Sequence, residues 1–309
     1  MTTVHVVASC TKRKRAVVHN ELRLGSLGGS ADPDAWLARL ESVDVPRVAA
    51  RDLYAGEHWK LVLDLEKQLR AAGREVRLWV ASAGYGLVSA DTKLKPYSAT
   101  FAPGTPDSVA PVSETSQLRL WWRSLCAAHG HSLRDLAREG ASALVVIGSA
   151  KYVRAMSEDL QGALAELPED ALTLFSGAGE VDDLLQPSLV KVDARVQVAL
   201  GQGDSLRGTK QGLAARTAQT LLTSTTSWPP RASELGAAYN RLVTDHAPPA
   251  VPQRERHDDQ AVLDFIKAQL REDPRLGWTP LLRRWRASGQ ACEQKRFRGL
   301  FRSVTDKTP

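Results

Sequence analysis

The chain has 309 residues, a net charge of +6 and a hydrophobic fraction of 43%. This composition is ordinary for a soluble globular protein, and the length suits one large domain with a smaller one. No stretch approaches the roughly 20 apolar residues of a membrane span, and the first residues do not resemble a signal peptide. The three cysteines are widely separated, so we expect no disulfide framework and predict a cytoplasmic protein.

Apolar runs alternate with segments of helical periodicity along residues 1–246. Short apolar runs predict strands at residues 4–8, 76–80, 143–147 and 172–175. Helical spacing and cap residues predict helices at residues 34–40, 56–72, 116–129, 132–139, 152–167, 205–223 and 233–244. This alternation predicts an α/β domain with a mostly parallel sheet and helices on both of its faces.

Each predicted strand is followed by a small and polar segment. The four segments read SCTKRK from Ser9, SAGYG from Ser82, GSAKY from Gly148 and SGAG from Ser176. Small residues also allow tight turns into helices, so one such segment alone carries little weight. Because the carboxyl ends of parallel strands share one edge of a sheet, the four segments together predict a common pocket.

The end of the chain is basic. Residues 247–257 are rich in proline and predict a linker, and three apolar stripes in residues 258–309 predict a small helical domain that resembles a helix-turn-helix unit. Residues 279–309 contain eight basic and two acidic side chains, which predicts contact with DNA; a solvated basic face is the alternative. The predicted DNA-binding residues are Arg283, Arg284, Arg286, Lys295, Arg296, Arg298 and Arg302.

Several familiar kinds of site lack their signature in this chain. It has no Walker loop, no dinucleotide fingerprint and no Gly-x-Ser-x-Gly elbow. Cys126, His129 and His131 lack a second ligand pair at zinc spacing, so we expect no metal site, and no cofactor is predicted. Cys10 lies close to two lysines and is either an activated thiol or a small buried residue.

Three of the five tyrosines lie near two carboxylates. Tyr54 follows Asp52, and Tyr85 and Tyr97 flank Asp91. Asp52 has the alternative role of a helix cap, and Asp91 that of a turn residue. Aromatic rings stack on bases, lysines bind phosphates and a carboxylate stabilises a reacting sugar. The cluster therefore predicts a pocket for a nucleic-acid base.

Three sequence blocks resemble the YaaA-like superfamily. They are Cys-x-x-x-Lys at residues 10–14, Asp-Leu-Tyr-x-Gly at residues 52–56, and SAGYGLVSADTKLKPYSAT at residues 82–100. The resemblance covers roughly the first third of the chain, and it implies a fold related to uracil-DNA-glycosylase-like α/β domains. The chain lacks the Gly-Gln-Asp-Pro-Tyr loop of ordinary uracil glycosylases, so the resemblance does not supply the group that activates water.

The resemblance and the basic C-terminal segment together imply a DNA glycosylase. The expected enzyme flips a modified base out of phage DNA, for example glucosylated hydroxymethylcytosine, and hydrolyses its N-glycosidic bond as a defence against the phage. A base-exchanging transglycosylase and a non-catalytic DNA-binding protein are the alternatives. The expected catalytic residues are Asp91, Asp52 and Tyr85. The expected substrate-binding residues are Ser9, Cys10, Lys12, Lys14, Tyr54, Ser82, Gly84, Gly86, Lys93, Lys95, Tyr97, Ser149 and Ser176.

Overall fold

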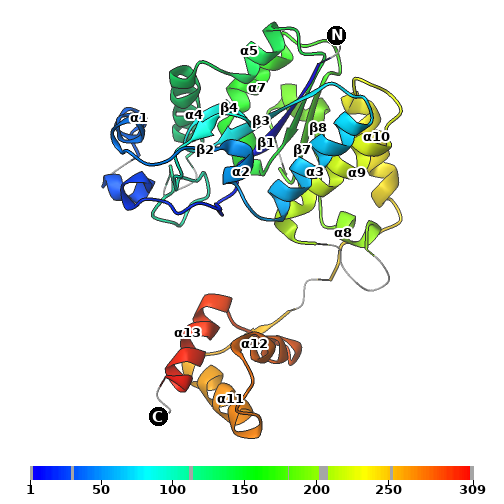
Figure 1. Cartoon of the computed structure of the whole chain (residues 1–309). Coiled ribbons are helices and arrows are strands. Elements are labelled where there is room, and N and C mark those ends of the chain that lie inside the picture. Colours follow the sequence, from blue (N-terminus) through cyan, green and yellow to red (C-terminus); the bar gives the residue numbers. More distant parts are fainter. Residues whose placement is uncertain are drawn as a thin grey trace. The chain divides into compact units, whose positions relative to one another are not determined.

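A six-stranded sheet lies at the centre of the larger of two units in the computed structural model (Figure 1). The units are Met1–Pro249 and Ala250–Pro309. Among the described residues, no helix is long and apolar enough to cross a membrane. The structure describes residues 3–28, 31–110, 114–179, 181–201, 208–250 and 253–306.

Five of the six strands run parallel, in the order β4-β3-β1-β6-β7-β8, and β4 runs antiparallel to β3. The central strand β1 pairs Val4 with Val76 of β3 and with Ala143 of β6. The predicted mostly parallel sheet is therefore confirmed. The strands are β1 (Val4–Ser9), β3 (Val76–Ser82), β4 (Gly86–Ser89), β6 (Ala143–Ile147), β7 (Leu172–Ser176) and β8 (Leu189–Lys191).

The four predicted strands are buried almost throughout, with Arg77 of β3 as the one exposed residue among them. Every residue of β1, β6 and β7 is buried, which explains their unbroken apolar runs. The sequence prediction missed β4, because it starts at Gly86 in a segment that resembles a polar loop, and β8, because it has only three residues. It also missed β2 (Val48–Ala49) and β5 (Lys93–Leu94), which form a separate antiparallel pair.

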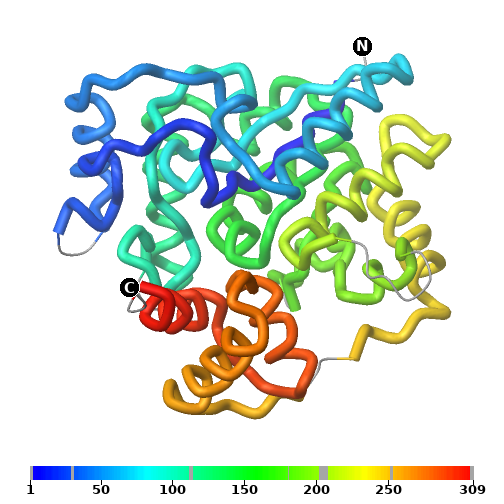
Figure 2. The backbone as a smooth tube through the Cα atoms, turned by 60° about the horizontal axis from the view of Figure 1, so that its bottom comes forward, coloured from blue at the N-terminus to red at the C-terminus, as the bar shows by residue number. Residues whose placement is uncertain are grey.

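Helices cover both faces of the sheet, as predicted (Figure 1). One face carries α3 (Glu57–Ala71), α9 (Leu213–Ser224) and α10 (Ala232–Val243). The other carries α4 (Thr115–His129), α5 (Leu133–Arg138), α6 (Ala150–Ala155) and α7 (Ser157–Leu164). The helices α3 and α9, far apart in the sequence, lie side by side (Figure 2).

Two predicted helices differ from the observed ones. The helix expected at residues 152–167 is two helices, α6 and α7, which meet at Met156. The hydroxyl of Ser157 donates to the carbonyl oxygen of Arg154, and such local bonds compete with helix continuation. The helix expected at residues 205–223 begins at Leu213, and residues 205–207 lie outside the described residues.

The described part of the second unit contains three helices around its own apolar core (Figure 2). They are α11 (Asp259–Glu272), α12 (Trp278–Ala287) and α13 (Gln294–Thr305). A short parallel ladder joins β9 (Glu255–Arg256) to β10 (Gln290–Ala291). The segment predicted to be a linker therefore includes a strand of this unit. The core consists of Val262, Ile266, Leu281, Leu282, Trp285, Cys292 and Phe297.

A buried lysine holds the end of the first helix, α1 (Pro33–Ser42). The ammonium group of Lys95 donates to the carbonyl oxygens of Leu40, Glu41 and Val43, at 2.7, 3.0 and 2.6 Å. Carbonyl groups at the end of a helix lack partners within it and carry the negative end of its dipole. All three ammonium protons are used, so none is left for a substrate. This corrects the role in substrate binding that we expected for Lys95.

We expect Lys95→Met to lower the free energy of unfolding by about 2–3 kcal/mol, because three carbonyl groups lose a charged donor. The exposed neighbour Lys93 supplies a matched control, and Lys93→Met should change stability by less than about 0.5 kcal/mol. Urea unfolding of the full chain measures both values. Equal stabilities of the two variants would contradict the capping role.

Candidate functional site

The winding of the sheet reverses between β1 and β6. After β1 the chain passes to β3 on one side, whereas β6, β7 and β8 lie on the other side. Ligands of open α/β sheets bind at such a reversal, beyond the carboxyl ends of the strands. The structure has a cavity of about 390 Å³ at this place, which we call the switch-point pocket. Its lining includes Ser9, Cys10, Lys12, His58, Gly148, Ser149, Tyr152, Gly177 and Lys210.

A chain of hydrogen bonds leads from the core to the wall of this pocket. The hydroxyl oxygens of Ser82 and Tyr97 lie 2.7 Å apart, and Tyr97 donates to the sulfur of Cys10 at 3.3 Å. The same sulfur lies 3.0 Å from the hydroxyl oxygen of Tyr152. Tyr54 joins the chain, with its hydroxyl oxygen 3.1 Å from that of Tyr97. We call these five buried side chains the Tyr–Cys network.

The backbone gives this chain a direction. The N–H groups of Gly84 and Tyr85 donate to the hydroxyl oxygen of Ser82, at 3.3 and 3.0 Å. Because these donors occupy its lone pairs, the hydroxyl proton of Ser82 is directed to Tyr97. Tyr97 donates to the sulfur of Cys10, whereas either atom can be the donor between Cys10 and Tyr152 at the pocket wall. Polarisation along such a chain strengthens its final hydrogen bond.

Burial keeps the network neutral. It raises the pKa values of Tyr54, Tyr97 and Tyr152 well above the ordinary value of 10.0. The three phenols are therefore protonated donors at neutral pH. The ammonium group of Lys14 lies 4.4 Å from the ring centroid of Tyr97 and 5.6 Å from that of Tyr54. A cation over a ring draws electron density from it, which makes the phenol a stronger donor.

The three blocks of the superfamily resemblance meet in this network. Cys10 and Lys14 come from the first block, Tyr54 from the second, and Ser82 and Tyr97 from the third. The structure thus brings together five of the predicted substrate-binding residues. Of these, Cys10 also lines the switch-point pocket.

The two carboxylates expected to act on a sugar lie outside the switch-point pocket. Asp91 follows β4, whose Ser89 pairs with Trp79 in the middle of β3, so Asp91 lies away from the carboxyl end of that strand. It accepts a hydrogen bond from Arg51 at 2.6 Å, and 73% of its side chain is exposed. Asp52 is exposed on α2 (Ala50–Leu53). Their expected chemical role gains no support from this placement.

Tyr85 and the two glycines beside it serve the packing of the β3–β4 turn. The hydroxyl of Tyr85 donates to the carbonyl oxygen of Lys95 and accepts from its N–H group, both at 3.1 Å. A Cβ atom on Gly84 would lie 2.4 Å from the Tyr97 ring. Gly86 has a φ of 70°, and a Cβ there would meet the backbone of Cys126 at 2.8 Å. These contacts give all three residues a structural role. Because the hydroxyl of Tyr85 is bonded to the backbone of Lys95, this placement corrects the catalytic role that we expected for it.

Of the remaining residues that we expected to bind substrate, three line the switch-point pocket and two lie outside its lining. Ser9, Lys12 and Ser149 line the switch-point pocket. Ser176 is fully buried at the end of β7 and accepts a hydrogen bond from the N–H group of Ala178. Lys93 is exposed on β5 and is not part of the pocket lining.

Several residues of the pocket were missed by the sequence prediction, among them His58, Tyr152 and Lys210. Tyr152 ends the segment GSAKY, and the position of this segment after a predicted strand could have indicated it. His58 precedes Val62 and Leu65 at helical spacing, which places it on the buried face of α3. The Nε2 atom of His58 lies 3.1 Å from the carbonyl oxygen of Ser9. Lys210 carries no comparable signal in the sequence.

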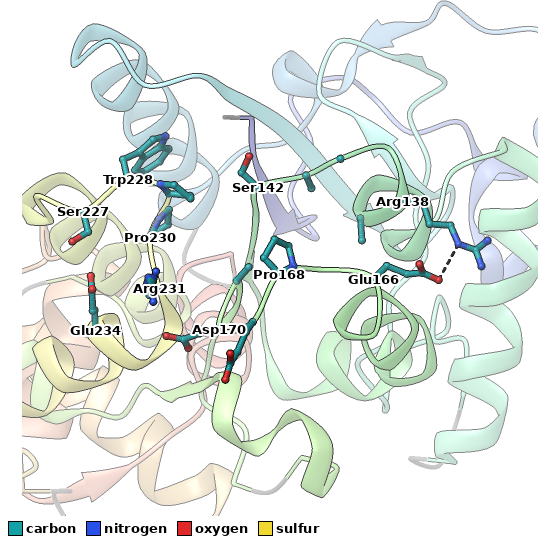
Figure 3. Close-up of a pocket in the computed structure, with 16 residues that line it drawn as sticks. Arg138, Ser142, Glu166, Pro168, Asp170, Ser227, Trp228, Pro230, Arg231 and Glu234 are labelled. Carbon is teal, nitrogen blue, oxygen red and sulfur yellow. Dashed lines mark hydrogen bonds and ion pairs between the residues drawn. The ribbon is translucent and has the colours of Figure 1, made fainter. Parts of the chain in front are cut away.

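A larger cavity, of about 950 Å³, lies at the amino ends of β6 and β7, at the other end of the strands from the switch-point pocket (Figure 3). Its lining includes Ser142 just before β6 and Asp170 just before β7. Two of its carboxylates have structural partners: Glu166 accepts from Arg138 at 3.0 Å, and Asp170 accepts from the N–H group of Ser233 at 2.9 Å. This cavity contains none of the predicted site residues, and we assign it no function.

Comparisons of the chain with protein-family models, with curated proteins and with solved structures find no match. Among the described residues, no group of three or more His, Cys, Asp or Glu side chains could hold a metal ion. The superfamily resemblance therefore stays a prediction. The function must be argued from the geometry of the switch-point pocket and from the charge of the chain.

The buried imidazole of His58 predicts a pH dependence of stability. Burial lowers the pKa of His58 from 6.5 to about 4. A histidine with a lowered folded pKa stabilises the fold fully above about pH 6.5 and loses this contribution toward pH 4, because the unfolded chain binds the proton more tightly. We expect a loss of about 3 kcal/mol from this residue over that range.

Urea unfolding at several pH values measures this contribution. The decline in stability between pH 6.5 and pH 4 should be smaller in His58→Gln than in the wild type. His19→Gln changes a histidine whose side chain is 53% exposed and should keep the wild-type slope. Equal slopes in the two variants would show that His58 titrates normally in the folded chain.

Proposed function

We propose that the protein binds a nucleoside flipped out of DNA in the switch-point pocket and hydrolyses its N-glycosidic bond. One observation carries this proposal: three distant sequence blocks meet in a buried network of hydrogen bonds, and two of its members, Cys10 and Tyr152, line the switch-point pocket. The cavity volume, about 390 Å³, lies in the range of small-molecule sites and suits a nucleoside. The finer fold assignment, a uracil-DNA-glycosylase-like domain in a cytoplasmic protein, belongs to the same proposal.

The lining of the pocket suits an extruded nucleotide. Lys12 and Lys210 are exposed and line the pocket, where their ammonium groups would bind the flanking phosphates. Gly148 and Gly177 have no side chains and lie after β6 and β7, which leaves room for a bulky substituent on the base. On this ground, and from the resemblance, the proposed substrate is a glucosylated hydroxymethylcytosine in phage DNA.

The Tyr–Cys network would act on the departing base. In hydrolysis the oxygen of water bonds to C1′ of the sugar, the C1′–N bond breaks, and its electron pair goes to the base. The base gains negative charge, and a hydrogen bond from Tyr152 stabilises it. Water loses a proton to solvent and the base takes one up. A chain of neutral donors, polarised by Lys14, fits this task better than it fits a positively charged sugar.

The second unit supplies the affinity for DNA in this proposal. The helices α12 and α13 are joined by residues 288–293, a connection that contains β10 and is longer than the usual helix-turn-helix turn of about three or four residues. Gly289 in this connection has a φ of 83°. Exposed basic side chains of the two helices would bind phosphates or the edges of bases. They are Arg283, Arg284, Lys295, Arg298 and Arg302.

We expect Tyr152→Phe to slow base release by about 100-fold, because the change removes only the hydroxyl that would donate to the base. Binding of the same DNA should be nearly unchanged. The measurement incubates the full chain with DNA that carries glucosylated hydroxymethylcytosine, and with unmodified DNA, and then counts strand breaks after alkali. Asp91→Asn is the matched control and should keep its rate within about twofold, since its partner is Arg51.

The other outcomes separate the competing functions. Loss of activity in Asp91→Asn with activity retained in Tyr152→Phe would return the catalytic role to the carboxylate. Incorporation of labelled free base without abasic sites would indicate a transglycosylase. Tight binding with no strand breaks in any DNA would indicate a non-catalytic DNA-binding protein.

A further inference from the structure

Four arginines line a pocket in the second unit. The pocket has a volume of about 570 Å³, and its lining includes Arg254, Arg256, Arg286 and Arg296 together with Glu293. The ladder of β9 with β10 brings the first two arginines close to the turn after α12. Arginines that lie far apart in the sequence therefore converge on one place, which we call the arginine pocket.

Backbone carbonyl groups hold three of these guanidinium groups in place. Arg286 donates to the carbonyl oxygen of Cys292 at 2.9 Å, and Arg254 donates to that of Arg286 at 3.3 Å. Arg296 donates to the carbonyl oxygen of His257 at 2.9 Å. A carbonyl group orders the side chain without cancelling its charge. Each guanidinium has five N–H donors, so donors remain for a ligand.

Carboxylates neutralise only part of this charge. Arg296 forms an ion pair with Asp259 at 2.6 Å. Within the described residues, Arg254, Arg256 and Arg286 form no ion pair. Glu293 is the one acidic side chain in the pocket lining. Four cations, three of them held by carbonyl groups, against two carboxylates leave a positive site, and an oxyanion relieves the mutual repulsion of the guanidinium groups.

We propose that the arginine pocket binds phosphate groups of the DNA backbone. Guanidinium groups bind phosphate oxygens with two parallel hydrogen bonds, which makes arginine the preferred residue for ordered phosphate sites. Arg254 and Arg256 precede the basic end of the chain, so composition did not single them out. The inference rests on DNA being the proposed substrate, but it does not depend on cleavage of the glycosidic bond.

The test compares two double variants of the full chain by fluorescence anisotropy with a DNA duplex over a series of salt concentrations. We expect Arg254→Gln with Arg256→Gln to weaken binding at least about tenfold at low salt. The slope of log affinity against log salt should become shallower by about 1.8, since each lost phosphate contact contributes about 0.9. The matched control is Arg271→Gln with Arg275→Gln, which removes two exposed arginines of the same unit outside the pocket. Its slope should stay close to that of the wild type.

The single variant Arg256→Gln keeps the test independent of folding, because this side chain forms no hydrogen bond or ion pair with the described residues. It should reduce the slope by about 0.9, equally for modified and unmodified DNA, since phosphate contacts carry no information on the base. Equal slopes in the pocket variants and the control would overturn the arginine pocket. If these slopes behave as expected but no DNA releases a base, the arginine pocket stands and the proposed hydrolysis fails.

Discussion

The candidate site depends on the hydrogen bond of 2.7 Å between the hydroxyl oxygens of Ser82 and Tyr97. It joins the carboxyl end of β3 to a loop that follows β5. Through it, the N–H groups of Gly84 and Tyr85 that donate to Ser82 polarise the hydroxyl of Tyr97. The bond requires glycine at position 84, because the Tyr97 ring fills the space of a Cβ atom there. The carbonyl oxygen of Gly84 in turn accepts from the indole of Trp36 at 2.8 Å. The turn, the ring and α1 are therefore fixed together, and the donor chain is ordered before any ligand binds.

Burial decides which charge this site can stabilise. The phenols of the Tyr–Cys network stay protonated, since burial raises their pKa values, and Lys14 lies against the rings of Tyr54 and Tyr97. Burial also lowers the pKa of Lys14 itself, so its charge is held at some cost in free energy. Such surroundings favour negative charge in the pocket and oppose positive charge. This is why the proposed role of the network is on the departing base, whereas the carboxylates expected to stabilise the sugar lie elsewhere.

The sequence predicted positions along the chain better than it predicted the directions of side chains. Strands buried on both faces were recognisable as apolar runs, and the polar segments after them do share one edge of the sheet. Asp52 and Tyr54 show the limit: they belong to one motif, yet the first is exposed and the second is buried in the network. Lys95 looked like a phosphate ligand because its role in capping α1 depends on residues about fifty positions earlier. Contacts of this kind arise from tertiary packing and leave no local pattern.

The two units contribute different chemistry to the proposed function, and this difference bears on specificity. Under the proposed function, the arginine pocket would contact a backbone that is the same in every DNA, so it would add affinity without selecting a base. Selection of the base to be released would then arise where that base enters, which is the switch-point pocket. There Gly148 and Gly177 leave space, and several polar side chains line the wall. A pocket with such space rejects little by steric exclusion, so discrimination would come from hydrogen bonds to the base, including the proposed one from Tyr152. A base that departs without negative charge would gain little from that donor, however tightly the DNA is bound.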